Sequence, residues 1–193
     1  MHASERTLAP LIRFPTGRSS QLESLVQEVR ETVNLNDASA DAAEMPARIA
    51  EILKAYLPAK ELLNQSQRQP DAESYRRHTV YRDPDGQFTI LALVWLPGHE
   101  TPIHGHMAWG AVGLYSGELN VCNYEIFGTR AGSMHLKQVS EIDATEGDTC
   151  WVKGGIDDIH RIRNTSDSPA ISIHIYGMDV PPESQSLNIL FPQ

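Results

Sequence analysis

At about Tyr75 the spacing of hydrophobic residues changes from the 3.6-residue period of a helix to the two-residue period of a strand. This change is the sequence feature that most limits which folds the chain can adopt. From there on, short runs rich in β-branched and aromatic residues alternate with turn signals such as Asp83-Pro84-Asp85-Gly86. In chain order the runs are HTVYR, FTILALVWL, GAVGLYS, LNVCNYEIF, MHLKQV, DTCWV, IHRIR and AISIHIY. Many short strands without intervening helices are typical of an antiparallel sandwich or barrel. Residues 75–193 are therefore predicted to form an all-β core.

The segment before Tyr75 is predicted to be helical. Ser20, three residues before Glu23, has the spacing of a capping box at a helix start. A second helix is expected over Pro46–Leu57, because proline suits a first helical turn and Pro58 stops the pattern. The first helix has one apolar face, formed by Leu22, Leu25, Val26, Val29 and Val33. We expect residues 1–74 to form a helical layer packed on the barrel, in one compact domain.

The charge balance argues against polyanionic partners. The chain has 16 Lys plus Arg and 25 Asp plus Glu, a formal net charge of -9, so neither nucleic acid nor an anionic membrane is expected as a partner. No apolar run reaches the roughly 18 residues of a membrane span, and no secretory signal is visible at the start. Only Cys122 and Cys150 are available for disulfides, so the reducing cytoplasm is the predicted location. Nothing in the sequence indicates an oligomeric state.

Three histidines stand where they could share a metal ion. His104 and His106 are two residues apart in an expected strand, so both side chains point to one face. His160 lies on a later strand, with Asn164 four residues after it, and a small barrel could bring it opposite the first pair. Imidazole is the commonest transition-metal ligand in proteins. Taken alone, a His-x-His pair is explained equally well by a surface or core role.

The two histidine segments resemble the two sequence motifs of the cupin superfamily, which are double-stranded β-helix (jelly-roll) barrels with a metal in the mouth. Lys153 departs from the second motif, where proline is usual. Another departure is the absence of a glutamate after His106, where most cupins supply a carboxylate ligand. The residues that match are Gly98, His104-Gly105-His106 and Gly117 for the first motif, and Gly147, Gly155, His160 and Asn164 for the second.

An all-histidine triad favours particular chemistry. Three neutral ligands leave the ion's charge of about +2 uncompensated, so the site suits a substrate atom that binds as an anion, such as a thiolate. Three ligands on one face of an octahedral iron(II) also leave room for substrate and dioxygen together. Zinc in a three-histidine site is the rival interpretation, and ligand identity alone does not separate the two.

Within the cupins, residues 75–176 resemble the thiol dioxygenases of the cysteine dioxygenase family, whose members also begin with helices. The resemblance implies that His104, His106 and His160 hold one Fe(II) per chain. It further implies that Arg77 binds the substrate carboxylate with Tyr75 beside it. The matching segments are Tyr75-Arg76-Arg77, Gly86-Gln87-Phe88, Pro102-Ile103-His104-Gly105-His106, Gly117, His160-Arg161-Ile162-Arg163-Asn164 and Ser172-Ile173-His174-Ile175-Tyr176.

Ser172, His174 and Tyr176 alternate along the last strong strand and so face one side. In the family they form a hydrogen-bonded relay beside the metal, with the tyrosine hydroxyl directed at substrate. The ordinary alternative is a satisfied core histidine beside a barrel aromatic.

The family pattern is not matched everywhere. The position of the cysteine that crosslinks to the active-site tyrosine in mammalian members is Gly110 here, so no thioether is expected. Relatives selective for 3-mercaptopropionate often carry an arginine after the relay tyrosine, and the segment after Tyr176 has none. Cys122 and Cys150 are interpreted as structural thiols.

The remaining candidates carry less weight. Trp109 is close enough to the histidine pair to wall the substrate pocket, although the sequence fits a core role at least as well. Asp157 and Asp158 could approach the metal but suit a solvated acidic turn. Arg161 and Arg163 are expected to point outward. Surface or core roles are expected for the other histidines considered, which are His78, His99 and His135.

The favoured hypothesis is a mononuclear non-haem iron thiol dioxygenase that converts cysteine to cysteine sulfinate with O2. Its partners are a small thiol carboxylic acid and dioxygen. A 3-mercaptopropionate dioxygenase is the first alternative. A metal-dependent cupin of other chemistry, and a non-catalytic small-molecule binding cupin, are the others.

Overall fold

The computed structural model describes residues 19–36, 44–130, 133–181 and 187–191. Within these ranges, two α-helices and two short 3-10 helices precede ten strands. The helices are α1 (Ser20–Asn36), α2 (Met45–Tyr56), η1 (Lys60–Leu62) and η2 (Ser66–Arg68). The strands are β1 (Arg76–Arg82), β2 (Thr89–Trp95), β3 (His104–His106), β4 (Gly110–Ser116), β5 (Glu118–Arg130), β6 (Ser133–Thr145), β7 (Thr149–Val152), β8 (Gly155–Arg163), β9 (Ala170–Tyr176) and β10 (Asn188–Leu190).

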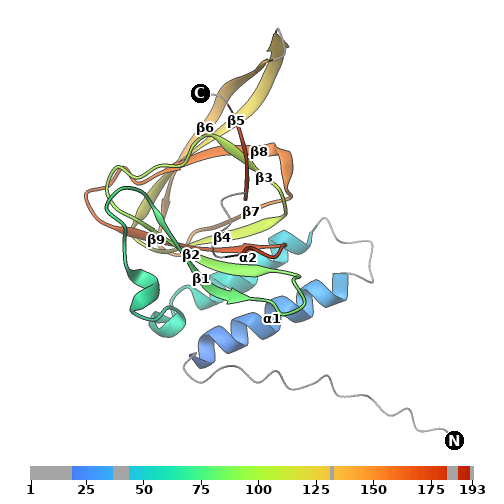
Figure 1. The fold of residues 1–193 in the computed structure, drawn as a ribbon, viewed down its shortest axis with the longest axis vertical. Coiled ribbons are helices and arrows are strands. Elements are labelled where there is room, and N and C mark those ends of the chain that lie inside the picture. Colours follow the sequence, from blue (N-terminus) through green and yellow to red (C-terminus); the bar gives the residue numbers. More distant parts are fainter. Residues whose placement is uncertain (1–18, 37–43, 131–132, 182–186, 192–193) are drawn as a thin grey trace, which may run out of the picture.

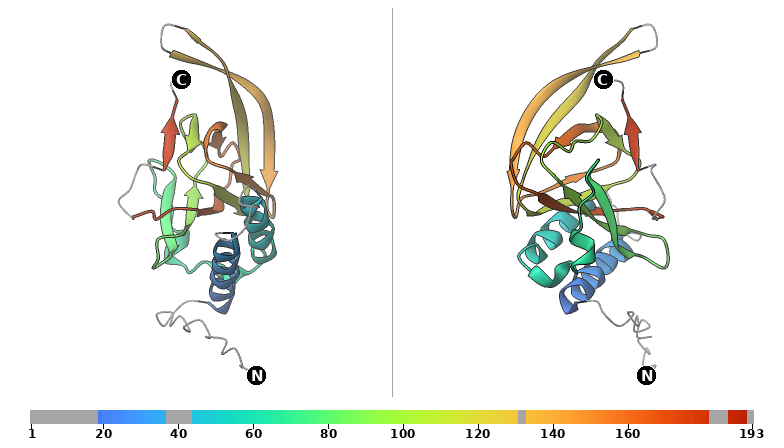
Figure 2. Two further views of the ribbon diagram at one scale, coloured as in Figure 1. Left: turned by 90° about the vertical axis from the view of Figure 1, so that its right-hand side faces the viewer. Right: turned by 60° about the vertical axis from the view of Figure 1, so that its left-hand side comes forward.

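The strands form two antiparallel sheets that face each other across a barrel (Figure 1). One sheet has the order β1-β2-β9-β4-β7 and the other β10-β3-β8-β5-β6. The predicted fold class, an all-β jelly-roll core with N-terminal helices, is confirmed. Strands β5 and β6 are longer than their hydrophobic runs suggested, and their hairpin projects beyond the barrel (Figure 2).

Successive side chains of β2 and β9 point to opposite faces of the first sheet and so contribute to two separate hydrophobic cores. Ile90 and Ala92 of β2, with Ile173 of β9, face the helices and join one cluster with α1 and α2. The residues between them, such as Leu91 and Leu93, face the barrel interior in a second cluster. The same period of two therefore fixes which β9 side chains enter the barrel.

The helices cover the outer face of the first sheet (Figure 1), with α2 against β4 and β7. The predicted proline at the start of α2 is confirmed, since Pro46 lies in its first turn. The predicted cap of α1 is wrong by one residue. The hydroxyl of Ser19, not Ser20, accepts the Leu22 N–H at 3.2 Å, because the helix begins at Ser20 and the capping residue must precede it.

A partly buried ion pair ties α1 to the hairpin between β1 and β2. Arg30 donates to the carboxylate of Asp83 and, at 2.7 Å, to the hydroxyl of Tyr81. The other carboxylate oxygen of Asp83 accepts the backbone N–H groups of Asp85 and Gln87. The predicted turn is present, and Gly86 has the positive φ of 74° that it requires.

Within the described part of the chain, no helix has the length and apolar character needed to cross a membrane.

Candidate metal centre

His104, His106 and His160 meet inside the barrel, as their sequence spacing allowed. His104 and His106 both point inward from β3, and His104 pairs in register with His160 of β8. The Nε2 atoms of His104 and His160 are 3.1 Å apart, and one nitrogen from each of the three rings lies within 4.8 Å of the others. All three side chains are buried. The cluster therefore has the spacing of ligands around a single ion.

Gly105 lets the two strands of this cluster approach closely. A Cβ on Gly105 would lie 2.8 Å from the carbonyl oxygen of Gly155 on β8. Since the side chains of His104 and His106 face the interior, the residue between them faces outward, where the backbone of Gly155 and the ring of Phe191 lie close. Any larger residue there would push β3 away from β8.

Burial keeps the three imidazoles neutral. It lowers the pKa of His106 to about 4, with repulsion from His104 as a second cause, and it lowers the pKa of His160 well below its ordinary value. Burial also lowers the pKa of His104. The Nδ1 of His104 lies 3.0 Å from the carbonyl oxygen of Pro102, so Nδ1 carries the proton and Nε2 presents its lone pair to the cluster.

The donor set fits a divalent transition metal. Among the described residues the cluster contains three histidines and no carboxylate. The carboxylate of Asp158 instead accepts the backbone N–H of Lys153 at 2.9 Å, which agrees with a turn role. The side chain of Asp157 lies outside the described residues.

Ser172, His174 and Tyr176 form a continuous hydrogen-bonded row along β9. The Ser172 hydroxyl is 2.8 Å from His174 Nε2, and His174 Nδ1 is 3.0 Å from the Tyr176 hydroxyl. All three are buried. Burial lowers the pKa of His174 to about 3 and raises the pKa of Tyr176 well above its ordinary value.

Trp95 sets the direction of this row. Its indole N–H, which can only donate, lies 2.9 Å from the Ser172 oxygen. The Ser172 proton then goes to Nε2 of His174, the acceptor that the described structure places within reach. A neutral His174 must carry its proton on Nδ1 and donate it to the Tyr176 oxygen. The hydroxyl proton of Tyr176 is consequently directed away from the row.

Arg77 and Tyr75 line the same small pocket as the three histidines and Tyr176. The cavity has a volume of about 20 Å³. Arg77 Nη2 lies 3.4 Å from the Tyr75 hydroxyl, and the Tyr75 ring stacks on Trp95 with centroids 4.6 Å apart. The positive charge of Arg77 contributes to the lowered pKa values of His104 and His174. An anionic group in this pocket would face a cation and a hydroxyl.

Sequence reasoning missed several residues of this pocket. Leu187 and Asn188 line it because β10 pairs with β3, placing Asn188 opposite His106. Trp95 and Thr101 line it as well. Trp95 ends the continuous apolar run TILALVW, which predicts a strand but not which side chains face the site. Nothing local indicates that residues 188–190 return to pair with β3.

Trp109 lies elsewhere. It does not line the small pocket; its ring covers Gly177, where a Cβ would collide with it, and it packs against the core shared with the helices. The predicted contact of Trp109 with substrate is thus not supported by its position. Of its two predicted roles, as a wall of the substrate pocket or as a core residue, the packing of Trp109 fits the core role.

The two arginines near His160 and the three other candidate histidines lie away from the metal centre and make contacts typical of structural or surface residues. Arg161 points outward as expected, toward the sulfur of buried Cys122 at 4.0 Å. Arg163 also points outward and faces Glu100. His99 accepts the Leu96 N–H, His78 lies 2.7 Å from the Gln69 carbonyl, and His135 is exposed.

Comparison with known proteins gives one family match and several partial structural similarities. The model of the family described as cysteine dioxygenase type I matches residues 15–187. The protein TT1209 from Thermus thermophilus has 18% identity and a TM-score of 0.45, over 60% of this chain and 96% of that one. A double-stranded β-helix protein from Klebsiella pneumoniae has 17% identity and a TM-score of 0.45, over 66% and 93%. A Cupin 2 conserved barrel domain protein from Salinispora arenicola has 16% identity and a TM-score of 0.42, over 59% and 83%.

Proposed function

Because the chain belongs to the cysteine dioxygenase type I family, we propose that it is a mononuclear iron(II) thiol dioxygenase acting on cysteine. The thiol RSH and O2 combine to give the sulfinic acid RSO2H, so both oxygen atoms are retained in the product. The observation that carries the proposal is a cluster of three neutral imidazoles sharing one pocket with a cation and a tyrosine hydroxyl. A second candidate substrate is 3-mercaptopropionate, which has the same thiol and carboxylate.

His104, His106 and His160 are the proposed ligands of one Fe(II) per chain. The directed Nε2 of His104 and the absence of a carboxylate among the described cluster residues support this assignment. When bound, iron(II) supplies Lewis acidity that favours the thiolate form of a coordinating thiol, together with redox chemistry toward dioxygen.

Arg77 is the proposed partner of the substrate carboxylate. A guanidinium binds a carboxylate through charge-assisted and often bidentate hydrogen bonds, and Arg77 lines the pocket beside the cluster. The stacked ring of Tyr75 holds one side of the guanidinium in place. Trp109 is left out of the proposed site because its ring lies over Gly177.

Tyr176 is the proposed hydrogen-bond donor to the reacting atoms. The direction of the row from Trp95 through Ser172 and His174 leaves its hydroxyl proton available to the pocket that it lines. The high pKa of Tyr176 keeps this proton in place at neutral pH.

The deciding experiment measures oxygen uptake by iron-loaded protein with cysteine, 3-mercaptopropionate and cysteamine in parallel, with mass spectrometry of the products. Uptake with cysteine and formation of the sulfinate are expected, with less or none for cysteamine, which lacks the carboxylate. The His160→Ala variant should lose both metal and uptake.

Purified protein that holds zinc and consumes no oxygen with any thiol would favour a metal-dependent cupin of other chemistry. Stoichiometric thiol binding without turnover would favour a non-catalytic binding protein.

A further inference from the structure

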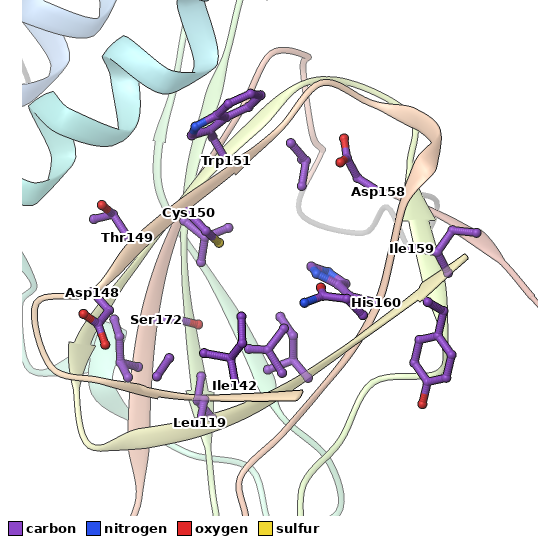
Figure 3. Close-up of a pocket in the computed structure, with 18 of the residues that line it drawn as sticks. Leu119, Ile142, Asp148, Thr149, Cys150, Trp151, Asp158, Ile159, His160 and Ser172 are labelled. Atoms are coloured by element: carbon purple, nitrogen blue, oxygen red, sulfur yellow. The ribbon is translucent and has the colours of Figure 1, made fainter. Parts of the chain in front are cut away.

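A second and much larger cavity lies within the barrel beside the histidine cluster. Its volume is about 520 Å³. Strands β4 to β8 supply most of its walls, and its lining is largely apolar, including Leu114, Leu119, Val121, Ile142, Ala144 and Ile159. Figure 3 shows His160 and Ser172 directed into this space, facing Ile142 and Leu119.

The two cavities meet at the cluster. Val112, His160 and Ile162 line both of them, so these side chains form the partition between the small pocket and the large one. The ring of His160 is thus reached from either side. Whatever enters the large cavity arrives next to a proposed metal ligand.

The large cavity extends to the edges of both sheets. Strands β6 and β7 are the last strands of their sheets. Ile142 and Val139 of β6, and Trp151 of β7, line the cavity and are 53%, 46% and 41% exposed. The side chains at these unpaired edges therefore join solvent to the interior by an apolar path.

The charges of the two cavities differ. The small pocket contains Arg77, whereas the charged residues that line the large one are, in the described part of the chain, all acidic: Glu125, Asp148 and Asp158. An anionic thiol acid is repelled by this set, while a neutral apolar molecule is not. Apolar protein cavities readily hold apolar gases such as xenon.

We propose that the large cavity is the binding and access site for dioxygen, separate from the pocket that takes the thiol. The inference rests on the proposed function. A thiol acid beside Arg77 would occupy the small pocket, whose free volume is only about 20 Å³, and would leave no room there for a second reactant. Dioxygen then reaches the centre past Val112 and Ile162, which line both cavities.

The first test is independent of catalysis. Dissolved dioxygen under pressure accelerates the NMR relaxation of nearby methyl groups, and the full chain freed of paramagnetic metal is suitable for this. The methyl groups of Leu119, Val121 and Ile162 should relax several-fold faster than those of Ile49 and Leu53, which are buried in the helical core. Equal relaxation in the two sets would overturn the proposal.

The second test fills the cavity. Ala144→Trp should abolish the extra relaxation and, in the iron-loaded enzyme, raise KM for oxygen about fivefold or more while KM for the thiol stays within about twofold. Lys137→Trp is the matched control, since it adds the same ring to an exposed position on the same strand. Ile142→Trp replaces the first variant if Ala144→Trp does not fold.

A rise in KM for the thiol with no change for oxygen would assign the cavity to the thiol and refute the proposal. If no thiol supports oxygen uptake, the proposed function fails, and the relaxation measurement still decides whether dioxygen occupies the cavity.

Discussion

At the scale of single residues, the hydrogen-bond donors of the site determine where protons lie. Trp95 can only donate, so the row through Ser172 and His174 has one direction, and Tyr176 is left with a proton for the pocket. Arg77 supplies the positive charge of the same pocket. Both features lead to predictions at this scale.

Arg77→Ala should raise KM for cysteine about tenfold or more, because the carboxylate loses a charge-assisted partner. Steady-state kinetics with cysteine, alongside metal analysis, measures the effect. Metal content should stay unchanged, and exposed Arg76→Ala is the control. Unchanged kinetics would remove Arg77 from the site.

Trp95→Phe should lower kcat by about tenfold, less than the roughly 10²–10⁴-fold effect of a group acting directly as acid or base. The phenyl ring can still stack on Tyr75, but the donor that orients Ser172 is lost. The measurement is kcat across pH at constant metal content. Ile90→Val, on the face of β2 that packs against the helices, should leave the kcat profile as it is; a similar loss there would indicate general loosening.

At the scale of elements, the short strand β3 positions two of the three clustered histidines, and the helices pack against the sheet that contains β9. Strand β3 has only three residues and is held between β8 and β10. The closeness of β3 and β8 depends on Gly105, and the outward-facing side chains of β9 are buried in a core that the helices complete. Each dependence can be tested by one substitution.

Gly105→Ala should separate β3 from β8 and reduce metal content, with a loss of about 1–3 kcal/mol in stability. The added Cβ would lie 2.8 Å from a backbone oxygen, which cannot move aside as a flexible side chain would. Gly128→Ala is the control, because a Cβ there meets nothing within 4 Å. Full metal binding by Gly105→Ala would contradict the expectation; metal per chain is measured by elemental analysis.

Leu53→Ala should lower the free energy of unfolding by about 2–5 kcal/mol, the cost of removing a fully buried leucine. Leu53 is 0% exposed in the cluster that joins α2 to the first sheet. Denaturant unfolding measures the change, and Leu35→Ala, at a position 71% exposed, should cost little. Equal effects of the two substitutions would show that α2 does not share a hydrophobic core with the outer face of the first sheet.

At the scale of the whole molecule, the barrel buries four histidines around one interior space. His104, His106, His160 and His174 all have pKa values lowered by burial. Because the folded state disfavours protonation, the unfolded state binds more protons once the pH falls below the unperturbed value of about 6.5. Stability must therefore rise with pH in that range.

In metal-free protein, the free energy of unfolding should be constant above about pH 6.5 and fall as the pH drops from there toward 4, where His106 begins to titrate in the folded state. Denaturant unfolding in a chelating buffer at several pH values measures the slope. His174→Gln should reduce it, since that group titrates only at about 3 when folded. A flat profile between pH 6.5 and 4 would show that the histidines are not buried as described.

The spacing of residues along the sequence by itself determined where the strands and helices form and which side chains share a face. The alternating runs predicted the strands, and two-residue spacing put His104 with His106, and His174 with Tyr176, on common faces. The proline and apolar patterns also predicted both helices, with errors of one residue at the cap of α1 and at each end of α2. These features depend on the backbone period of a single element, which neighbouring residues dictate.

Only the tertiary structure decided how separate strands meet. The register that sets His160 opposite His104, the return of β10 to place Asn188 in the pocket, and the indole of Trp95 behind Ser172 all join residues far apart in the chain. Trp109, adjacent to the histidine pair in sequence, turned instead to the helical core. The large cavity is likewise lined by side chains from several strands. It lies where β6 and β7 end their two sheets and their apolar side chains have no neighbouring strand beside them. Register, strand order and packing are properties of the whole fold, and no local period encodes them.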